Sequence, residues 1–404
     1  MAGFWHRLFG GLFTNRLAKN SQSTPFLGTS TASGSVINAE TALRLSAVWA
    51  CVRLRSQTIA SLPLHLYDTD NQVANKHPLY RILHDYPNAN MTASEFWESM
   101  VASLDLWGNA YAFIIRAEKS TEVIALDVLN PENMSIARDK DGKISYIYSE
   151  NGKQLEFDSE QILHIKGFTL DGLVGLSPIQ YQSQVMGFQM DANNAANHEF
   201  KNNLKAGGFL KTSQAVLTSE QRERLRGNLT EFGKAENAGK FMVLEAGMDV
   251  AGTVGVRMNP QDAQLLESRY FGIEEICRTF GVPPQLVYHT DKASSWASSL
   301  ENMNLGFLMY SLRPILVRIE QTIIKKLLSP EERRKYKPRF SVEGLLRADS
   351  AGRSAFYTSA LQNGWLTRNE VRELEDLPPL DGGDELTVQL NLTPLKDLGK
   401  QVLT

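Results

Sequence analysis

Two short motifs carry residues that could bind phosphate or zinc. Residues 233–240, GKAENAGK, resemble a phosphate-binding loop, but five residues separate the glycines instead of four, and Phe241 stands where a Ser or Thr would bind magnesium. His198 and Glu199 resemble the start of a zinc-protease motif, but Asn202 stands where the second histidine should be. We interpret the first motif as a turn and His198 as a residue on an ordinary helix face.

The sequence also has no complete motif for acid–base or nucleophilic catalysis. The carboxylate pairs, such as Glu274 with Glu275 and Glu331 with Glu332, are adjacent in sequence, and neighbours on a helix point about 100° apart. No Gly-x-Ser-x-Gly elbow occurs, and the seven histidines are scattered singly. The sequence therefore predicts a protein that is not an enzyme, with no catalytic residue, no cofactor and no metal site.

A motif that reads DNA could begin at Thr367 to Glu370, as the second helix of a helix-turn-helix. Basic side chains are few in this region and acidic ones lie between them. They are Arg353, Arg368 and Arg372, interspersed with Glu370, Glu373, Glu375 and Asp376. Phosphates would repel such a helix from a groove, so small packed helices are the better interpretation.

The composition limits the partners of the chain. The formal net charge is −3, whereas a protein that grips DNA through its phosphates usually has a basic excess. Hydrophobic residues make up 42% and charged residues 22%, as in folded globular proteins. Cys51 and Cys277, distant in sequence, form no framework of bridges and indicate a reducing cytosolic origin. No run approaches about 18 apolar residues, so we predict no membrane span.

Hydrophobic spacing predicts a mixed first half. Helical spacing over 39–62 ends at Pro63, and Thr92 forms a capping box with Glu95 for a helix that Gly108 stops. Alternating or apolar segments predict strands at 64–67, 111–116, 124–129, 144–148 and 162–165. The expected fold class is α+β.

Long helices dominate the second half. Ser177 begins one that runs to about Leu204, and a second spans 262–280. A polar loop follows, and then an amphipathic helix over 300–327, inside which Pro314 should produce a kink.

The order of these elements, with several segments, resembles the portal (head–tail connector) family of long-tailed phages from about Glu40 to Leu392. The segments are SAVWACVRLRSQTIASLPLHLY, SEFWESMVASLDLWGNAYAFIIR, GLVGLSPI, FKNNLKAGGFL, LEAGMDV, RYFGIEEICRTFGVPPQLV and NGWLTRNEVRELEDLPPLDGGDEL. No one of them is diagnostic alone, but in this order they are specific.

The resemblance implies a portal fold with a mixed α/β wing, a two-helix stem, a small α/β clip, a long kinked wing helix and a helical C-terminal crown. The implied ranges are 1–38 for a flexible N-terminal arm, 39–176 for the wing, 177–205 for the first stem helix, 206–260 for the clip, 261–287 for the second stem helix, 288–299 for the tunnel loop, 300–343 for the long wing helix and a strand, and 344–404 for the C-terminal wing or crown helices and tail.

The implied site is the part of the tunnel loop that faces the DNA channel. Its residues are Thr290, Asp291, Lys292, Ser294, Ser295 and Trp296. A conduit must hold a polyanion without binding it tightly, and one lysine in the loop fits weak, non-specific contact. Trp296 could equally touch DNA or anchor a neighbouring subunit.

The resemblance also implies function and partners. A ring of copies, a dodecamer in similar proteins, would sit at one capsid vertex as the channel for double-stranded DNA packaging and ejection. It would dock the terminase large subunit and the head–tail adaptor, contact the major capsid protein, and belong to the virion after assembly in the host cytoplasm. Two alternatives stay open: a minor capsid protein, and a DNA-processing protein with an unrecognised active site.

Overall fold

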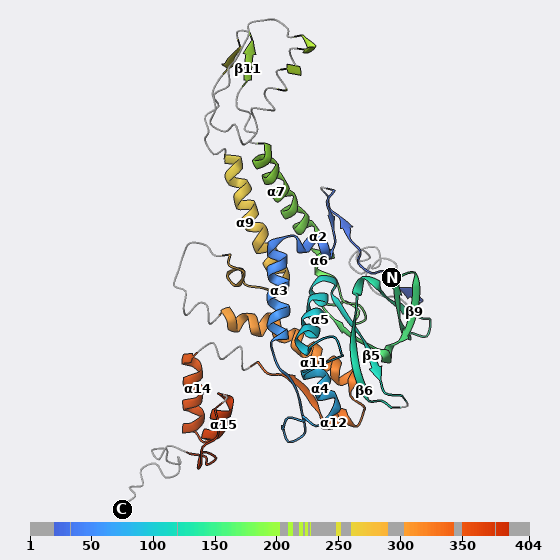
Figure 1. Ribbon diagram of the computed structural model, residues 1–404, viewed down its shortest axis with the longest axis vertical. Coiled ribbons are helices and arrows are strands. Elements are labelled where there is room, and N and C mark those ends of the chain that lie inside the picture. The colour runs from blue at the N-terminus through green and yellow to red at the C-terminus, as the bar shows by residue number, and fades with distance from the viewer. Residues whose placement is uncertain are drawn as a thin grey trace, which may run out of the picture. The chain divides into compact units, whose positions relative to one another are not determined.

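The computed structural model of the chain is drawn in Figure 1. It describes residues 20–202 except 33 and 119, then 209–212, 218–220, 223, 224, 227, 248–251, 260–289, 303–342, 350–375 and 377–387. The chain divides into two compact units, Met1–Ser61 with Leu66–Pro338 and Leu62–His65 with Arg339–Thr404. Helices and strands are mixed along the chain, which confirms the α+β class.

Two antiparallel sheets form the strand-rich part of the first unit. In one sheet β5 (Asn109–Arg116) lies between β10 (Ile162–Lys166) and β6 (Val123–Leu129). The other sheet has the order β1 (Ser21–Gln22), β7 (Met134–Arg138), β8 (Ile144–Glu150), β9 (Lys153–Asp158). The strands predicted near residues 111, 124, 144 and 162 are confirmed. Strand β9 was not predicted, because its residues are almost all exposed and give no apolar alternation.

One hydrophobic core joins the two sheets. Buried Tyr111 and Ile162 of the first sheet pack with Met134, Ile136 and Tyr146 of the second. Successive strand residues point to opposite faces, and β5 and β10 are buried on both faces, because α5 (Ala93–Trp107) packs on β5 and α11 (Arg313–Leu327) packs on β10. This packing fixes β5 and β10, which carry the polar residues described below.

Two helices of 15 residues, α3 (Ser46–Ala60) and α5 (Ala93–Trp107), pack against each other. The predicted capping box is present: Glu95 N donates to Thr92 Oγ1 at 3.3 Å, and Thr92 N donates to Glu95 Oε2 at 2.8 Å. Gly108 then ends α5 with a φ of 71°, a left-handed conformation that favours glycine. Shorter helical elements are α2 (Ala39–Leu43), α4 (Pro78–His84), η1 (Pro131–Asn133) and η2 (Ser159–Gln161).

Residues 1–38 were expected to form a flexible arm, but residues 20–38 contain strands. Besides β1, this range contains β2 (Thr29–Ser30) and β3 (Val36–Ile37), which pair with each other. Ser35 Oγ donates to Asp191 Oδ1 at 2.7 Å, and Ile37 is fully buried. Residues 20–38 are therefore held by contacts with β7 and with the helix that carries Asp191.

The second half contains a pair of long helices. After α6 (Pro178–Tyr181) come α7 (Ser183–Asn202) and α9 (Pro260–Phe280), and α7 and α9 lie side by side (Figure 1). Between them in sequence, β11 (Phe209–Thr212) pairs antiparallel with β12 (Met248–Ala251). The helix predicted from Ser177 onward is thus confirmed, except that it is interrupted at Gln182.

The helix predicted over 300–327 is described from residue 303 and is irregular in its first part. A π-helical segment, η5 (Phe307–Leu312), precedes α11 (Arg313–Leu327). Pro314 has no N–H to donate to the turn before it, and the wider π-helical turn lies directly ahead of it. The sequence predicted a kink at Pro314, and the structure has a π-helical segment immediately before this proline.

The second unit holds two small helices, α14 (Ser350–Gln362) and α15 (Arg368–Leu374). Thr367 and Glu370 form the capping box of α15. Buried Asn369 donates from Nδ2 to Leu380 O at 2.9 Å and accepts from Leu380 N at 2.8 Å. The start of α15 is thus fixed to the turn after it, which supports small packed helices.

The remaining elements complete the chain order. They are β4 (Leu64–Tyr67), which pairs with β13 (Lys337–Phe340), the short helix η4 (Pro284–Val287) that follows α9, and α12 (Glu332–Lys335). The strand predicted at 64–67 is confirmed.

In the part of the chain that the structure describes, no helix is long and apolar enough to cross a lipid bilayer.

Candidate functional site at the ends of the long helices

The residues expected in the tunnel loop, Thr290, Asp291, Lys292, Ser294, Ser295 and Trp296, lie outside the described residues, as does the GKAENAGK segment. The description stops at His289 and resumes at Met303. The candidate site is therefore built from the residues that fix these two ends, which are the carboxyl end of α9 and the segment η5.

The carboxyl end of α9 closes with a standard glycine stop. Gly281 has a φ of 64°, Val282 N donates to Cys277 O at 2.9 Å, and Gly281 N donates to Arg278 O at 3.2 Å. These two bonds form a Schellman motif, which satisfies carbonyls that the helix itself leaves free. The carbonyl of Phe280 takes no part in either bond and needs another donor.

Arg55 of α3 supplies that donor. Its guanidinium donates to Phe280 O and, at 3.2 Å, to Ser311 Oγ of η5. Its Nε lies 3.0 Å from Asp105 Oδ2 of α5, and the two side chains are only 12% and 5% exposed. One buried guanidinium thus connects four elements: α3, α5, α9 and η5.

Burial sets the protonation of Asp105. It raises the pKa of this carboxyl from an ordinary value near 3.8 to about 6, while the positive charge of Arg55 acts in the opposite direction. At neutral pH Asp105 is therefore the counter-ion of Arg55. Because buried charges are stable only when they are paired, neither residue can be removed alone without cost.

The two cysteines lie at the same contact. The Cys51 thiol of α3 donates to Cys277 Sγ of α9, with the sulfurs 3.9 Å apart, and both residues are fully buried free thiols. This hydrogen bond, together with burial, raises the pKa of Cys51. Sequence separation suggested no relation between them, whereas the fold makes them neighbours.

Two glycines allow the backbone before α6 to pack directly against the end of α5. A Cβ on Gly108 would lie 2.1 Å from Leu176 O, and a Cβ on Gly175 would lie 1.9 Å from Gly108 O, so only glycine fits at either position. Ser177 caps α6 by accepting from Gln180 N at 3.2 Å and also donates to Leu106 O at 2.7 Å. The GLVGLSPI segment is therefore a close backbone crossing that positions the first long helix.

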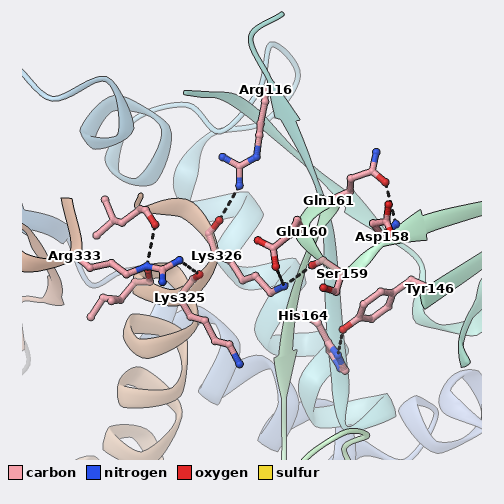
Figure 2. A network of polar contacts seen from close by, with 12 residues as sticks. Arg116, Tyr146, Asp158, Ser159, Glu160, Gln161, His164, Lys325, Lys326 and Arg333 are labelled. Atoms are coloured by element: carbon pink, nitrogen blue, oxygen red, sulfur yellow. Dashed lines mark hydrogen bonds and ion pairs between the residues drawn. The ribbon is translucent and has the colours of Figure 1, made fainter. Parts of the chain in front are cut away.

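The described residues that most resemble catalytic groups are Tyr146, His164 and Asn109. Tyr146 Oη lies 3.1 Å from His164 Nδ1, as Figure 2 shows, and His164 Nε2 lies 3.0 Å from Asn109 Oδ1. Burial lowers the pKa of His164 well below its usual value, so the imidazole is neutral. Both ring nitrogens already have protein partners, so we interpret this group as the polar part of the core between the two sheets.

Basic side chains surround the carboxyl end of α11 (Figure 2). Arg333 Nη2 donates to Lys325 O at 2.7 Å, and its Nε donates to Leu328 O at 3.0 Å. Arg116 of β5 donates to Lys326 O at 2.8 Å, and Lys326 Nζ lies 3.3 Å from Glu160 Oε1. Within the described residues, no group of three or more metal-binding side chains is close enough to hold a metal ion.

The long helices expose aromatic side chains. On α6, α7 and α9, Tyr181, Phe188, Tyr270 and Phe271 are each about half exposed. Large exposed apolar side chains that gather on one part of a protein mark contact surfaces more often than chance. Sequence analysis did not single them out, since their helical spacing is also that of core residues.

Arg55 and Asp105 were also missed by sequence analysis, although a signal was present. Arg55 lies at helical spacing with the buried Cys51 and Ile59, and Asp105 lies between the buried Leu104 and Leu106. A lone charge on an apolar helix face is seldom buried unless it is paired. One lone cation and one lone anion on two such faces could therefore have been proposed as partners.

Comparisons with known proteins agree with the order of elements. A family model described as "Phage portal protein" matches residues 46–376. The chain is 36% identical over 405 residues to the portal protein of Enterobacteria phage HK97, which covers 98% of this chain and 94% of that protein.

Two solved structures share the fold. One, from the neck of a native gene transfer agent particle computed with C12 symmetry, has a TM-score of 0.64 and 23% identity, over 92% of this chain and 100% of its own. The other, an HK97-family phage portal protein from Corynebacterium diphtheriae, has a TM-score of 0.56 and 17% identity, over 77% of this chain and 96% of its own.

Proposed function

The chain belongs to the phage portal protein family, and from this premise we propose that twelve copies close into a ring around an axial channel for double-stranded DNA. The observation that carries the proposal is the family match over residues 46–376, joined to an HK97 relative that aligns over 98% of the chain. In this proposal the ring is the conduit for packaging and ejection of the genome, and the protein has no chemistry of its own.

The ring is supported by the surface of the long helices. Exposed Tyr181, Phe188, Tyr270 and Phe271 would be covered by the next copy. A head-to-tail contact of this kind closes into a ring when the rotation between neighbours divides a full turn. The number twelve rests on the shared fold with the neck structure computed with C12 symmetry.

The channel is supported by the charge of the chain. A formal net charge of −3 offers no general attraction for phosphates, so DNA can pass without stalling at each contact. We propose that residues 288–299 form the loop that meets the DNA, with Lys292 as its one cation and Thr290, Asp291, Ser294, Ser295 and Trp296 beside it.

The remaining parts of the proposal follow the family. Residues 39–176 would form the wing, α6, α7 and α9 the stem, 206–260 the clip, and 344–404 the crown. The clip would meet the terminase large subunit and later the head–tail adaptor, while the wing would meet the major capsid protein at one vertex of the virion.

Native mass spectrometry of the purified chain tests the ring. We expect a species of twelve times 45.1 kDa, with smaller amounts of neighbouring ring sizes. A species that stays monomeric at every concentration, with nuclease or ATPase activity, would instead favour a DNA-processing protein.

Shortening the segment from Lys292 to Ser298 tests the channel loop. We expect rings of normal mass that package or retain less DNA, because the loop that meets the duplex is lost. A matched control shortens the polar turn at 139–142 between β7 and β8, far in sequence from the loop, and should leave packaging unchanged. Normal packaging by rings without residues 292–298 would contradict the role of the loop.

A further inference from the structure

Arg55 stands out because it contacts Phe280 and Ser311, which lie on the two sides of the chain segment that runs from His289 to Met303. We propose that Arg55 is a positioning residue: with Asp105 as its counter-ion, it holds the carboxyl end of α9 and the π-helical segment η5 at a fixed spacing. The consequence for DNA rests on the proposed function, but the positioning itself does not.

The first contact completes the end of α9. The Schellman bonds at Gly281 and Val282 leave Phe280 O without a helical partner, and the Arg55 guanidinium donates to it. A cation at the carboxyl end of a helix is also favoured by the helix dipole. The contact therefore fixes the direction in which the chain leaves α9 toward His289.

The second contact is on η5, where the chain returns. Arg55 Nη1 lies 3.2 Å from Ser311 Oγ, and a Cβ on Gly281 would lie 3.4 Å from that same oxygen. Ser311 Oγ also lies 3.5 Å from Phe280 O. The end of α9 and the π-helical turn thus meet directly, with the guanidinium bonded to both, and the φ of 64° at Gly281 favours glycine at this turn.

Asp105 keeps the guanidinium at this position by its charge. Its Oδ2 lies 3.0 Å from Arg55 Nε in an ion pair without the geometry of an N–H···O hydrogen bond, and the other guanidinium nitrogens remain free to donate to Phe280 O and Ser311 Oγ. Moving α9 away from η5 would leave a buried cation with a carboxylate but without its carbonyl. The polar groups left without partners make that movement unfavourable.

A second contact between α3 and α9 reports on the same region. Cys51 lies one helical turn before Arg55 on α3, and Cys277 lies one turn before Phe280 on α9. Their sulfurs are 3.9 Å apart and fully buried. Because both thiols are natural residues, their protection from a thiol reagent measures whether α9 stays seated on α3.

A stabilising role without positioning is the competing explanation, and one variant separates the two. In the double variant Arg55→Met with Asp105→Leu, both charges are replaced by apolar side chains of similar size, which often preserves or raises stability at buried ion pairs. The variant should fold and assemble, but Phe280 O and Ser311 Oγ lose their shared donor and keep only the long hydrogen bond of 3.5 Å between them. The matched control is Arg44→Met with Glu40→Leu, which removes an ion pair of 2.7 Å that is 70% and 77% exposed.

The experiment is hydrogen–deuterium exchange on the purified assembled protein, with reaction of Cys277 toward a thiol reagent beside it. In the double variant we expect exchange at residues 281–289 and 303–312 to become about ten-fold faster or more, while the two sheets are unchanged. Cys277 should also react faster. The control variant should match the wild type in both measurements.

Two further outcomes decide the proposal. Wild-type exchange and wild-type thiol protection in the folded double variant would overturn it, since the ends would then be held without Arg55. If the double variant does not fold, Arg55→Lys serves instead, because lysine keeps the charge but cannot reach Asp105, Phe280 and Ser311 together. We expect the same faster hydrogen exchange at residues 281–289 and 303–312. Unchanged exchange in Arg55→Lys would contradict the proposal.

The proposed function is tested separately in the same rings. Faster exchange with lower DNA retention supports both ideas. If exchange is faster in the double variant but neither the variant nor the wild type forms rings, the positioning role of Arg55 is supported and the proposed function is contradicted.

Discussion

Two helices of the first unit end at a guanidinium, and the two ends differ in their surroundings. At the end of α11, exposed Arg333 donates to carbonyls of the same helix terminus, Lys325 O and Leu328 O. At the end of α9, Arg55 comes from a different helix, is buried and is paired with Asp105. Arg333 is a local cap, beside which Arg116 of β5 donates to Lys326 O, whereas Arg55 joins three elements at once, two of them more than 200 residues away in sequence.

The difference teaches that hydrogen-bond chemistry alone does not show what an arginine does. Arg333 is exposed, so water can replace it as a donor at the end of α11, and its loss removes only hydrogen bonds within that helix end. Water cannot easily replace Arg55, because its counter-ion and its acceptors are shielded from solvent. We therefore expect substitutions at the end of α9 to lower the free energy of unfolding more, and to affect more distant residues, than substitutions at the end of α11.

The largest effect is expected at Asp105. Asp105→Ala leaves the Arg55 charge buried and unpaired, and we expect the free energy of unfolding to fall by about 3–5 kcal/mol. Denaturant unfolding at a fixed protein concentration measures it, since assembly also contributes to stability. The double variant Arg55→Met with Asp105→Leu should regain most of the loss. A loss below about 1 kcal/mol for Asp105→Ala would show that the pair is not shielded as described.

The next effect is a pH dependence that belongs to Asp105. Burial raises the pKa of Asp105 to about 6 in the folded protein, against a value near 3.8 in the unfolded chain. The folded state therefore takes up a proton at higher pH than the unfolded state does. This group's contribution to the free energy of unfolding is fully present below about pH 4 and is lost as the pH rises through about 6, on the order of 3 kcal/mol.

The measurement is the difference in unfolding free energy between the wild type and Asp105→Asn from pH 4 to pH 7. The asparagine does not titrate, so the wild type should gain relative to it as the pH falls. His164 contributes the opposite slope, because burial lowers its pKa and the unfolded chain is protonated first below about 6.5. That slope is common to both proteins and cancels in the difference. Parallel profiles would contradict the raised pKa of Asp105.

The smallest effect is expected at Arg333. Arg333→Met removes the hydrogen bonds of an exposed side chain at one helix end, and we expect a loss of about 1 kcal/mol in the free energy of unfolding. Hydrogen exchange should quicken only in the last turn of α11, with residues 281–289 and 303–312 unchanged. An effect of Arg333→Met as large as that of Asp105→Ala would remove the distinction between the two ends.

Much of the fold could be predicted from local rules. Thr92 with Glu95, Gly108 and Ser177 each mark a helix boundary by backbone hydrogen bonds or by φ, and these signals depend only on near neighbours. Strands with a clear apolar face, such as β5, were predicted for the same reason. The interruption at Gln182 and the π-helical turn before Pro314 depend on tertiary packing, so spacing alone did not place them.

The site was less accessible from the sequence. The meeting of Cys51 with Cys277, and of Arg55 with Phe280 and Ser311, depends on how distant helices pack, and no spacing rule encodes it. The family resemblance directed attention to residues 288–299, whereas the structure describes the contacts that fix both ends of that segment. Arg55 and Asp105, each a lone charge on an apolar helix face, were the local signs of a buried charge pair.

Electron cryomicroscopy of the purified, assembled protein tests the central claim most directly. The account predicts twelve copies around an axis, with an opening wide enough for a duplex, the exposed aromatic residues of α6, α7 and α9 covered by the neighbouring copy, and Arg55 between α9 and η5 in every subunit. An assembly without an axial opening, or a particle that is monomeric under all conditions, would contradict it.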